Sequence, residues 1–496
     1  MRRATLLGAG LSLAAMTAVV PAATQAAAPC NNDWPMFQHD PARTASATCA
    51  GLTTLDAPQL QPQWFVQTNG AVTAEPAIAW GHAFVGDGTG TMHAVDMATG
   101  EDSWTFDSTH NPEHVDRHDV SYGRITSSAS AVAVPSAGPT VFVGAGGTVY
   151  AIDAVNGHAR WAVDVDPAHP TSTAEVESSP VIWMRGHGRG PVVFVGMDTN
   201  EDPNSADGGV LALDARNGRL LWKYDAEKDQ VVHNLARRPH PDTACGDIWS
   251  SPALDTRRQM LFFGGGNCNL QSGKDTQRVW AINATTGRRV WTFYEPPANH
   301  GGDDDFGASV VLTRVDGRNV AVQAGKSGWV YVIDRVDGRL VRSAHAAVGA
   351  SVGGFIGSVA VATDPTSHHP VLYGDSAIPA SSDGGADMAT NPQRLTSLHA
   401  VDLVTGAVVW NEPAQSPSYA PVTVAGGIVF ASDTTQFSVK AYDASTGVPV
   451  WHVPVAAATS GGVAISGRSI VFGTGTYFNE SAKVPPQVTG IWCFAA

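Results

Sequence analysis

One short pattern recurs along the chain and constrains its fold more than any other feature. An apolar residue is followed by Asp or Asn, three further residues and Gly, and Trp comes a few residues later. The complete copies are AVDMATGEDSW (94–104), AIDAVNGHARW (151–161), ALDARNGRLLW (212–222), AINATTGRRVW (281–291), AVDLVTGAVVW (400–410) and AYDASTGVPVW (441–451). A degenerate copy, VIDRVDGRLVR (332–342), carries Arg342 near the position of the Trp.

Each copy predicts a strand, a tight turn and a second strand whose Trp packs between neighbouring units. Two more β-rich runs precede each copy, so every unit has four strands, which is typical of a propeller blade. An eighth unit, from GGVAISGRSIVFGTG to TGIWCFAA, lacks its outermost strand, which PQWFVQT around Trp64 could supply. We therefore expect an all-β, eight-bladed β-propeller closed by its two ends, with seven blades as the alternative.

The N-terminus has the features of an export signal. Arg2 and Arg3 precede an apolar run and then small residues, which predicts a signal peptide over 1–28, an N-terminal extension over 29–63 and a propeller over 64–496. The expected protein is secreted or otherwise extracytoplasmic by the Sec route, and the paired arginines also allow Tat export. No other run is long enough to span a bilayer. The net charge of −15 argues against binding to nucleic acid or anionic lipid.

The five cysteines suggest two disulfides in an oxidising compartment. We expect Cys30 to pair with Cys49 and Cys245 with Cys268, leaving Cys493 free. No Cys-x-x-Cys-His motif is present to attach a haem.

Departures from the repeat concentrate between residues 196 and 330. Trp249 stands before the strand residues SSPALD, near the expected central axis, where its indole offers a flat face to a planar ligand. The loop GMDTNEDPNSADGG, taken alone, favours a solvated connection over a metal site. In DDDFGAS, an extended backbone points Asp303 and Asp305 to one side and Asp304 to the other. Two carboxylates so close would raise one pKa strongly unless a cation lay between them.

Four segments in this order resemble the pyrroloquinoline-quinone (PQQ) dehydrogenases, with the polyvinyl-alcohol dehydrogenase branch as the best match. They are WSSPALD, DDDFGASVVL, GKSGWVYVIDR and VGASVGGFIGSV. The repeats extend the resemblance over nearly the whole mature chain, but only the part from about 196 to 360 is specific to this family.

The resemblance implies a role for individual residues. Trp249 matches the tryptophan that stacks on the quinone, and Lys326 the cation that contacts its oxygens. Glu201 and Asn267 match metal ligands. The remaining matches are Asp303 and Asp305, which supply the catalytic base and a further metal ligand in an order left open, and Glu75 and Arg124, which fit polar groups at the quinone's edge.

The implied function is oxidation of an alcohol, including a polymeric one, to an aldehyde or ketone with PQQ and Ca²⁺, with a lanthanide as the second choice of metal. Electrons would pass to a separate acceptor such as a cytochrome or quinone. The adjacent cysteine pair that covers the quinone in many of these enzymes is absent, which puts cofactor affinity in doubt. The alternative is a non-catalytic propeller that serves as a binding or assembly scaffold.

Overall fold

The structure is a computed structural model, and the residues that it describes are 33–47, 51–111, 114–186, 189–200, 202, 205–235, 245–268, 277–296, 305–349, 353–377, 398–412, 418–434, 436–477 and 488–496. The chain divides into two units, residues 1–31 and 32–496. The expected signal peptide and the Cys30–Cys49 pair lie outside the described residues. Every described strand belongs to the second unit.

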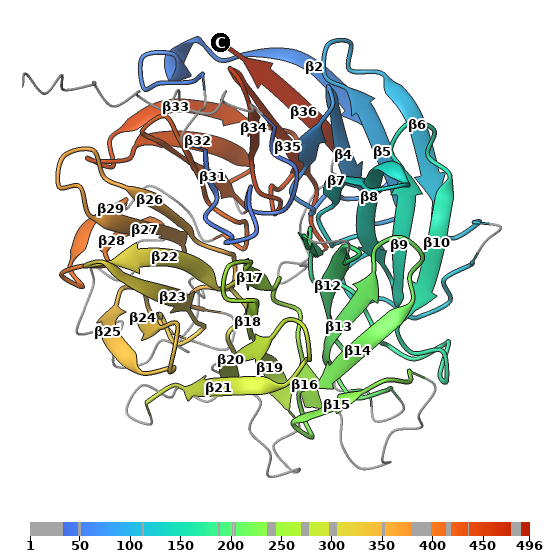
Figure 1. Cartoon of the computed structure of the whole chain (residues 1–496). Helices are drawn as coiled ribbons and strands as arrows, with labels where there is room; N and C mark the ends of the chain where they lie inside the picture. The colour runs from blue at the N-terminus through green and yellow to red at the C-terminus, as the bar shows by residue number, and fades with distance from the viewer. Residues whose placement is uncertain are drawn as a thin grey trace, which may run out of the picture. The chain divides into compact units, whose positions relative to one another are not determined.

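Eight sheets of four or five strands follow one another around a ring (Figure 1). Each consists mainly of antiparallel strands that follow one another in the chain, except that β1 pairs parallel with β30 and β2 joins β36. The neighbouring sheets pack face to face through their buried residues. The eight-bladed propeller is therefore confirmed, and the seven-bladed alternative is wrong. Within the described ranges, no helix is long and apolar enough to cross a bilayer.

The strands are assigned to the blades from the inside outward. Blade 1 has β3 (Ala77–Ala79), β4 (His82–Gly86), β5 (Thr91–Asp96) and β6 (Asp102–Asp107); blade 2 has β7 (Ser130–Val134), β8 (Gly138–Ala145), β9 (Thr148–Asp153) and β10 (Ala159–Asp164); blade 3 has β11 (Val181–Trp183), β12 (Val192–Met197), β13 (Gly209–Asp214), β14 (Leu220–Asp225) and β15 (Gln230–Val232); blade 4 has β17 (Ala253–Asp255), β18 (Met260–Gly264), β20 (Arg278–Asn283) and β21 (Arg289–Tyr294).

The second half of the ring repeats this order. Blade 5 has β22 (Val311–Val315), β23 (Arg318–Ala324), β24 (Trp329–Asp334) and β25 (Leu340–His345); blade 6 has β26 (Ala360–Thr363), β27 (Pro370–Asp375), β28 (Leu398–Asp402) and β29 (Val408–Glu412); blade 7 has β30 (Thr423–Ala425), β31 (Ile428–Asp433), β32 (Ser438–Asp443) and β33 (Pro449–Pro454), with β1 (Ser46–Ala47) beside β30; blade 8 has β34 (Ala464–Ser466), β35 (Ser469–Thr474), β36 (Gly490–Ala495) and β2 (Gln61–Gln67). Outside the blades lie the pair β16 (Cys245–Asp247) and β19 (Gly266–Cys268) and the short 3₁₀ helix η1 (Ala57–Gln59).

The N-terminal strand β2 closes the ring as expected. It pairs antiparallel with β36 (Figure 1). In this pairing Trp64 lies opposite Cys493. This pairing gives blade 8 its outermost strand from the opposite end of the chain. Cys493 is buried and is a free thiol.

The repeat exists because each Trp docks on the turn of the next blade. The indole Nε1 of Trp104 donates to the carbonyl of Ala154 at 3.0 Å, and that of Trp291 donates to the carbonyl of Arg335 at 3.1 Å. In the degenerate copy, Arg342 Nη1 donates to the carbonyl of Thr405 at 3.1 Å, so a guanidinium binds the same turn through a different carbonyl.

Two physical constraints require glycine at the last turn position of the repeat. Gly287 has a φ of +71°, which L side chains rarely adopt, and a Cβ added there would lie 2.8 Å from Cδ2 of Trp222. Gly317, in the turn between β22 and β23 and outside the repeat, offers a comparison, because it also has a positive φ, +76°, but open space around it.

Comparing Ala at these two positions separates the backbone cost from the docking cost. We expect Gly317→Ala to lower the free energy of unfolding by about 1 kcal/mol through backbone strain alone. Gly287→Ala should cost about 2–4 kcal/mol, because the displaced indole adds an overpacking penalty. Urea unfolding measures both; equal losses would show that Trp docking contributes nothing to the glycine requirement.

A ring of serines joins the inner ends of the blades around the axis. The backbone N–H of a residue at the start of one blade donates to a serine Oγ of the next blade, at 2.8–3.0 Å. The donor–acceptor pairs are Glu75–Ser128, Ser128–Ser179, Ser179–Ser251, Ser251–Ser309 and Ser309–Ser358. Pro421 stands at the corresponding position of blade 7, next to Val422, whose N–H donates to the Ser358 carbonyl.

The segment 34–47 runs along the inner strands and ties them together. Its backbone carbonyls accept hydrogen bonds from N–H groups in the innermost strands of five blades. The donor–acceptor pairs are Ala131–Pro35, Leu254–Pro41, Leu312–Ala42, Val361–Thr44 and Val424–Ala45. Trp34 exchanges both backbone hydrogen bonds with Ile78 of β3. We call residues 34–47 the axial segment.

Arg43 links the axial segment to blades 3 and 4. Its side chain is fully buried and donates to the carbonyls of Pro252 (3.0 Å), Phe37 (2.7 Å), Ser179 (2.9 Å) and Pro180 (3.1 Å). Burial lowers the pKa of Arg43 to about 10, against the charges of Asp40 and Glu75, so the guanidinium stays protonated at neutral pH.

A buried histidine in blade 1 makes stability depend on pH. His93 Nδ1 lies 3.1 Å from Asp102 Oδ2, and its Nε2 lies 3.8 Å from Asp87 Oδ2. Burial by itself would lower the pKa of His93, but the two carboxylates outweigh it and raise the pKa to about 9. The protonated form is thus favoured by folding.

We predict that the resulting stability is fully present below about pH 6.5 and is lost as the pH rises through about 9. The effect is at most about 3 kcal/mol. His93→Gln should flatten the dependence of the urea unfolding midpoint on pH between 6.5 and 9. A variant that keeps the wild-type slope would assign that slope to other groups.

Candidate functional site

A cavity of about 150 Å³ lies at the inner ends of the blades. Its lining follows from the repeat, because the loop before each innermost strand contributes one residue to an outer layer and, two positions later, one to the serine ring. The outer layer consists of Thr73, Thr126, Glu177, Trp249, Gly307, Ile356, Tyr419 and Ser460. Phe37 of the axial segment also lines the cavity.

Trp249 lies against a backbone that has no side chain. A Cβ added at Gly307 would lie 1.5 Å from Cη2 of the indole, so only glycine permits this approach. The indole is half-buried, and the cation Lys326 Nζ lies over its ring, 5.8 Å from the centroid. The expectation that Trp249 stands at the axis agrees with this position.

Asp305 and Lys326 meet beside Trp249. Lys326, in the turn between β23 and β24, places Nζ 2.6 Å from Oδ2 of Asp305, and its backbone N–H donates to the Asp305 carbonyl at 3.1 Å. Asp305 has no exposed surface, and its Oδ1 accepts from Gln277 Nε2 at 3.3 Å. The structure therefore brings together three of the expected residues, Trp249, Lys326 and Asp305.

The remaining expected ligands are only partly described. Glu201 and Asp303 lie outside the described residues, and of Asn267 only the backbone, in β19, is described. Gly266, the neighbour of Asn267, approaches Asp305 so closely that an added Cβ would lie 2.4 Å from its Cγ. Among the described side chains, no group of three or more His, Cys, Asp and Glu is arranged to hold a metal ion.

Glu75 and Arg124 are held by protein partners. Glu75 Oε1 accepts from Trp34 Nε1 and from the Gln38 N–H, both at 2.7 Å. Burial raises the pKa of Glu75 to about 7, although these hydrogen bonds oppose the rise. Arg124 forms an ion pair with the buried Asp116. Glu75 borders the cavity, whereas Arg124 is not among its lining residues.

Sequence reasoning missed a group of carboxyls beside this site. Asp198 was expected in a solvated loop, but it is 2 % exposed, and Asp247 has no exposed surface. The Thr199 N–H donates to Asp247 Oδ1 at 2.9 Å, and the Asn200 N–H donates to Asp198 Oδ1 at 2.8 Å. Burial and the neighbouring Asp198 charge raise the pKa of Asp247 well above its ordinary value, and burial also raises that of Asp198.

Two glutamates of blade 3 extend the group. Glu175 Oε1 accepts from the Ser121 N–H and, at 3.2 Å, from Asn200 Nδ2. Burial raises the pKa of Glu175 to about 8 against the Ser121 hydrogen bond, and the charge of Asp198 adds to the rise. Burial, Asp198 and Glu175 together raise the pKa of Glu177 strongly.

A sequence signal for Glu177 was present. In ESSP and WSSP, Glu177 and Trp249 occupy the same position two residues before a ring serine. Aligning the blade starts would therefore have placed both side chains in the outer layer of the cavity. Asp198 and Asp247 carry no comparable signal, because both stand outside the repeat.

These residues fit a planar, anionic cofactor and a cation. Buried carboxyls with raised pKa values mark a place that is short of positive charge, and carboxylate oxygens are the ligands that hard cations prefer. Trp249 offers an aromatic surface, and Lys326 offers a cation for anionic oxygens.

The fold and these residues define a class: an eight-bladed propeller with an indole, an ammonium and several carboxyls at its axis. Residues 34–392 match the family model of the PQQ-type glucose/ethanol/alcohol dehydrogenase β-propeller domain. The chain belongs to this family. Residues 346–485 also match the model of the outer membrane protein assembly factor BamB.

A curated relative is similar in sequence, and solved structures share the fold. A polyvinylalcohol dehydrogenase of Pseudomonas sp. is 25 % identical over 400 residues, covering 73 % of this chain and 56 % of the relative. The quinohemoprotein alcohol dehydrogenase from Comamonas testosteroni shares the fold with a TM-score of 0.72 at 18 % identity, over 94 % of this chain and 80 % of the other. A europium-containing methanol dehydrogenase gives 0.71 at 16 %, over 94 % and 98 %. The chain thus spans just over half the length of its polyvinylalcohol dehydrogenase relative.

Proposed function

We propose that this protein is an exported quinoprotein dehydrogenase that oxidises an alcohol to an aldehyde or ketone with PQQ and a bound metal ion. The observation that carries the proposal is the convergence of Asp305, Lys326 and Trp249 beside the axial cavity. Family membership supports the quinone. The cluster of buried carboxyls, whose raised pKa values indicate a lack of nearby positive charge, supports the cation.

In the proposed site, Trp249 would stack on PQQ, and the bound quinone would supply the two-electron oxidant for the alcohol. Lys326 would contact its oxygens, with Glu75 and Arg124 near its edge, and Glu201, Asn267 and Asp305 would hold the metal. Ca²⁺ suits these oxygen ligands, while the europium-containing relative makes a lanthanide the alternative.

The chain's own residues would handle the proton. Asp305, without exposed surface, can accept the alcohol proton as general base, with Asp303 as the other candidate. The ion pair with Lys326 fixes the Asp305 carboxylate in one orientation. A Cys245–Cys268 disulfide belongs to the proposal as well, and the register of β16 and β19 sets these residues directly opposite one another. Electrons would leave to a separate acceptor.

Reconstitution tests the proposal. Purified protein is mixed with PQQ and either Ca²⁺ or a lanthanide, freed of unbound quinone, and measured first for retained quinone absorbance. Dye reduction with a panel of short alcohols and polyvinyl alcohol is measured second. Retention and alcohol-dependent reduction are expected; absence of quinone retention with every metal would reject the proposal, and Lys326→Ala is the control for specific retention.

The BamB-type match over residues 346–485 supports a second candidate, a propeller that acts as an assembly scaffold. However, a scaffold has no need for the ion pair between Lys326 and the fully buried Asp305 beside Trp249. Failure of reconstitution, together with recovery of a stable protein complex from the native host, would favour it.

A further inference from the structure

An arginine-lined pocket of about 690 Å³ lies between blades 4 and 5. Strand β17 connects it to the axial site, since Trp249 precedes this strand and Asp255, Arg257 and Arg258 lie at its other end. The pocket is therefore separate from the candidate active site. Its further lining residues are Leu312, Thr313, Arg314, Asn319 and Arg335.

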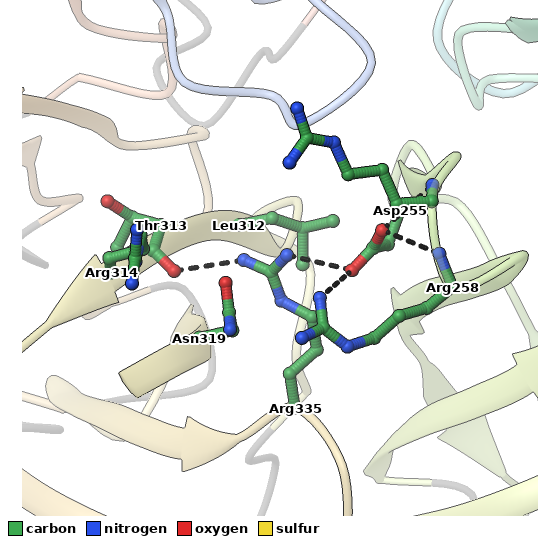
Figure 2. Close-up of a pocket in the computed structure, with 8 residues that line it drawn as sticks. Asp255, Arg258, Leu312, Thr313, Arg314, Asn319 and Arg335 are labelled. Atoms are coloured by element: carbon green, nitrogen blue, oxygen red, sulfur yellow. Dashed lines mark hydrogen bonds and ion pairs between the residues drawn. The ribbon is translucent and has the colours of Figure 1, made fainter. Parts of the chain in front are cut away.

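One carboxylate holds two of the four arginines. Asp255 Oδ2 accepts from Arg258 Nη1 and Arg335 Nη1, both at 3.0 Å (Figure 2). Its Oδ1 accepts from the backbone N–H groups of Arg257 and Arg258. Every oxygen of Asp255 is thus occupied by protein donors, and it neutralises one of two guanidinium charges.

Arg335 is the fixed element of the pocket. It is 8 % exposed, and its Nη2 donates to the carbonyl of Thr313 at 2.9 Å (Figure 2). The same nitrogen donates to the carbonyl of Val320 at 3.0 Å. Its Nε is buried without a hydrogen-bond partner among the described residues. Burial lowers the pKa of Arg335, and the nearby charge of Arg258 contributes to the decrease, while Asp255 opposes it.

The other two arginines are not neutralised by any described group. Arg314 donates to the carbonyl of Gly317, at 3.2 Å, and no described group pairs with the Arg257 side chain. Both are exposed. The pocket therefore gathers four guanidinium groups around one carboxylate in a chain whose net charge is −15.

We propose that this pocket binds a dianionic tetrahedral oxyanion, of the phosphate or phosphomonoester class. Guanidinium groups match such oxygens with paired hydrogen bonds, and an excess of several positive charges favours a dianion over a single carboxylate. The volume leaves room for a group attached to the phosphate.

The test is calorimetric titration of the full chain at constant ionic strength. The probes are inorganic phosphate, glycerol 1-phosphate, phosphatidate vesicles and acetate. The pocket variant, Arg257→Ala/Arg314→Ala, leaves the ion pairs of Asp255 with Arg258 and Arg335 intact. The control variant, Arg219→Ala/Arg288→Ala, lies at exposed turns of blades 3 and 4 and changes the net charge by the same amount.

We expect phosphate or its monoester to bind the wild type, and binding to weaken by at least about tenfold in the pocket variant but less than about twofold in the control. Tighter binding of the soluble ester than of vesicles would indicate a free metabolite, and the reverse a lipid headgroup. No binding of any phosphate probe, equal binding of acetate, or an equal loss in the control would overturn the proposal.

Discussion

Asp305→Asn is expected to lower the rate of alcohol oxidation by the reconstituted protein by about 10²–10⁴-fold. The amide is nearly the same size as the carboxylate, but it cannot accept the alcohol proton. It also leaves Lys326, whose Nζ now lies 2.6 Å from Oδ2, without its ion pair. The measurement is kcat in the dye-linked assay at saturating quinone and metal, with retained quinone quantified separately.

Asp304→Asn is the matched control for this prediction. It makes the same chemical change one residue away, and the extended backbone expected from the sequence would point its side chain to the opposite side. We expect its turnover to stay within about twofold of the wild type. If the Asp303, Asp304 and Asp305 amides behave alike, the assignment of Asp303 and Asp305 to one functional side is wrong.

The blade count was predictable because the repeat encodes contacts between neighbours. Asp, Gly and Trp recur together since each turn must adopt a positive φ and receive an indole from the preceding blade, as Gly287 and Trp222 show. Even the degenerate copy keeps the contact, with Arg342 donating to Thr405. Closure by β2 was predictable from counting strands, because blade 8 lacked its outermost one.

The site was predictable only where a residue type is unusual for its place. Trp249 before a serine pair stands out in the sequence, and Lys326 was expected from the family resemblance; the two side chains meet in the structure. Asp198, in the loop after β12, and Asp247, at the end of β16, are brought together only by the three-dimensional fold. Acidic loop composition normally indicates solvation, so the burial of Asp198 could not be inferred.

The axial segment was likewise not foreseen, although its chemistry is visible in the sequence. A lone arginine in DPARTAS looks solvated, yet Arg43 is fully buried, because four carbonyls at the ends of blades 3 and 4 and in its own segment need a donor. A short polar segment carries no periodicity that would place it along the inner strands.

Arg43→Ala is expected to lower the free energy of unfolding by about 3–5 kcal/mol. The change removes the donor of four carbonyls that have no access to water, and it leaves a cavity of guanidinium size. Arg43→Lys should recover only part of the loss, since an ammonium cannot reproduce the planar guanidinium's hydrogen bonds to all four carbonyls. Arg339→Ala, at a side chain that is 84 % exposed, should cost less than about 0.5 kcal/mol.

Hydrogen exchange shows where this loss occurs. The amides of Ala131, Leu254 and Leu312 donate to carbonyls of the axial segment, so they should exchange faster in Arg43→Ala than in the wild type at equal denaturant. Unchanged protection together with a loss below about 1 kcal/mol would mean that Arg43 does not anchor the segment.

Release of the axial segment should also reach the site, because Phe37 lines the cavity and Trp34 and Gln38 hold the Glu75 carboxylate. We therefore expect Arg43→Ala to retain less quinone than the wild type even at a temperature where it is fully folded. Arg339→Ala should retain it normally. Normal retention by folded Arg43→Ala would show that the axial segment supports the blades without shaping the site.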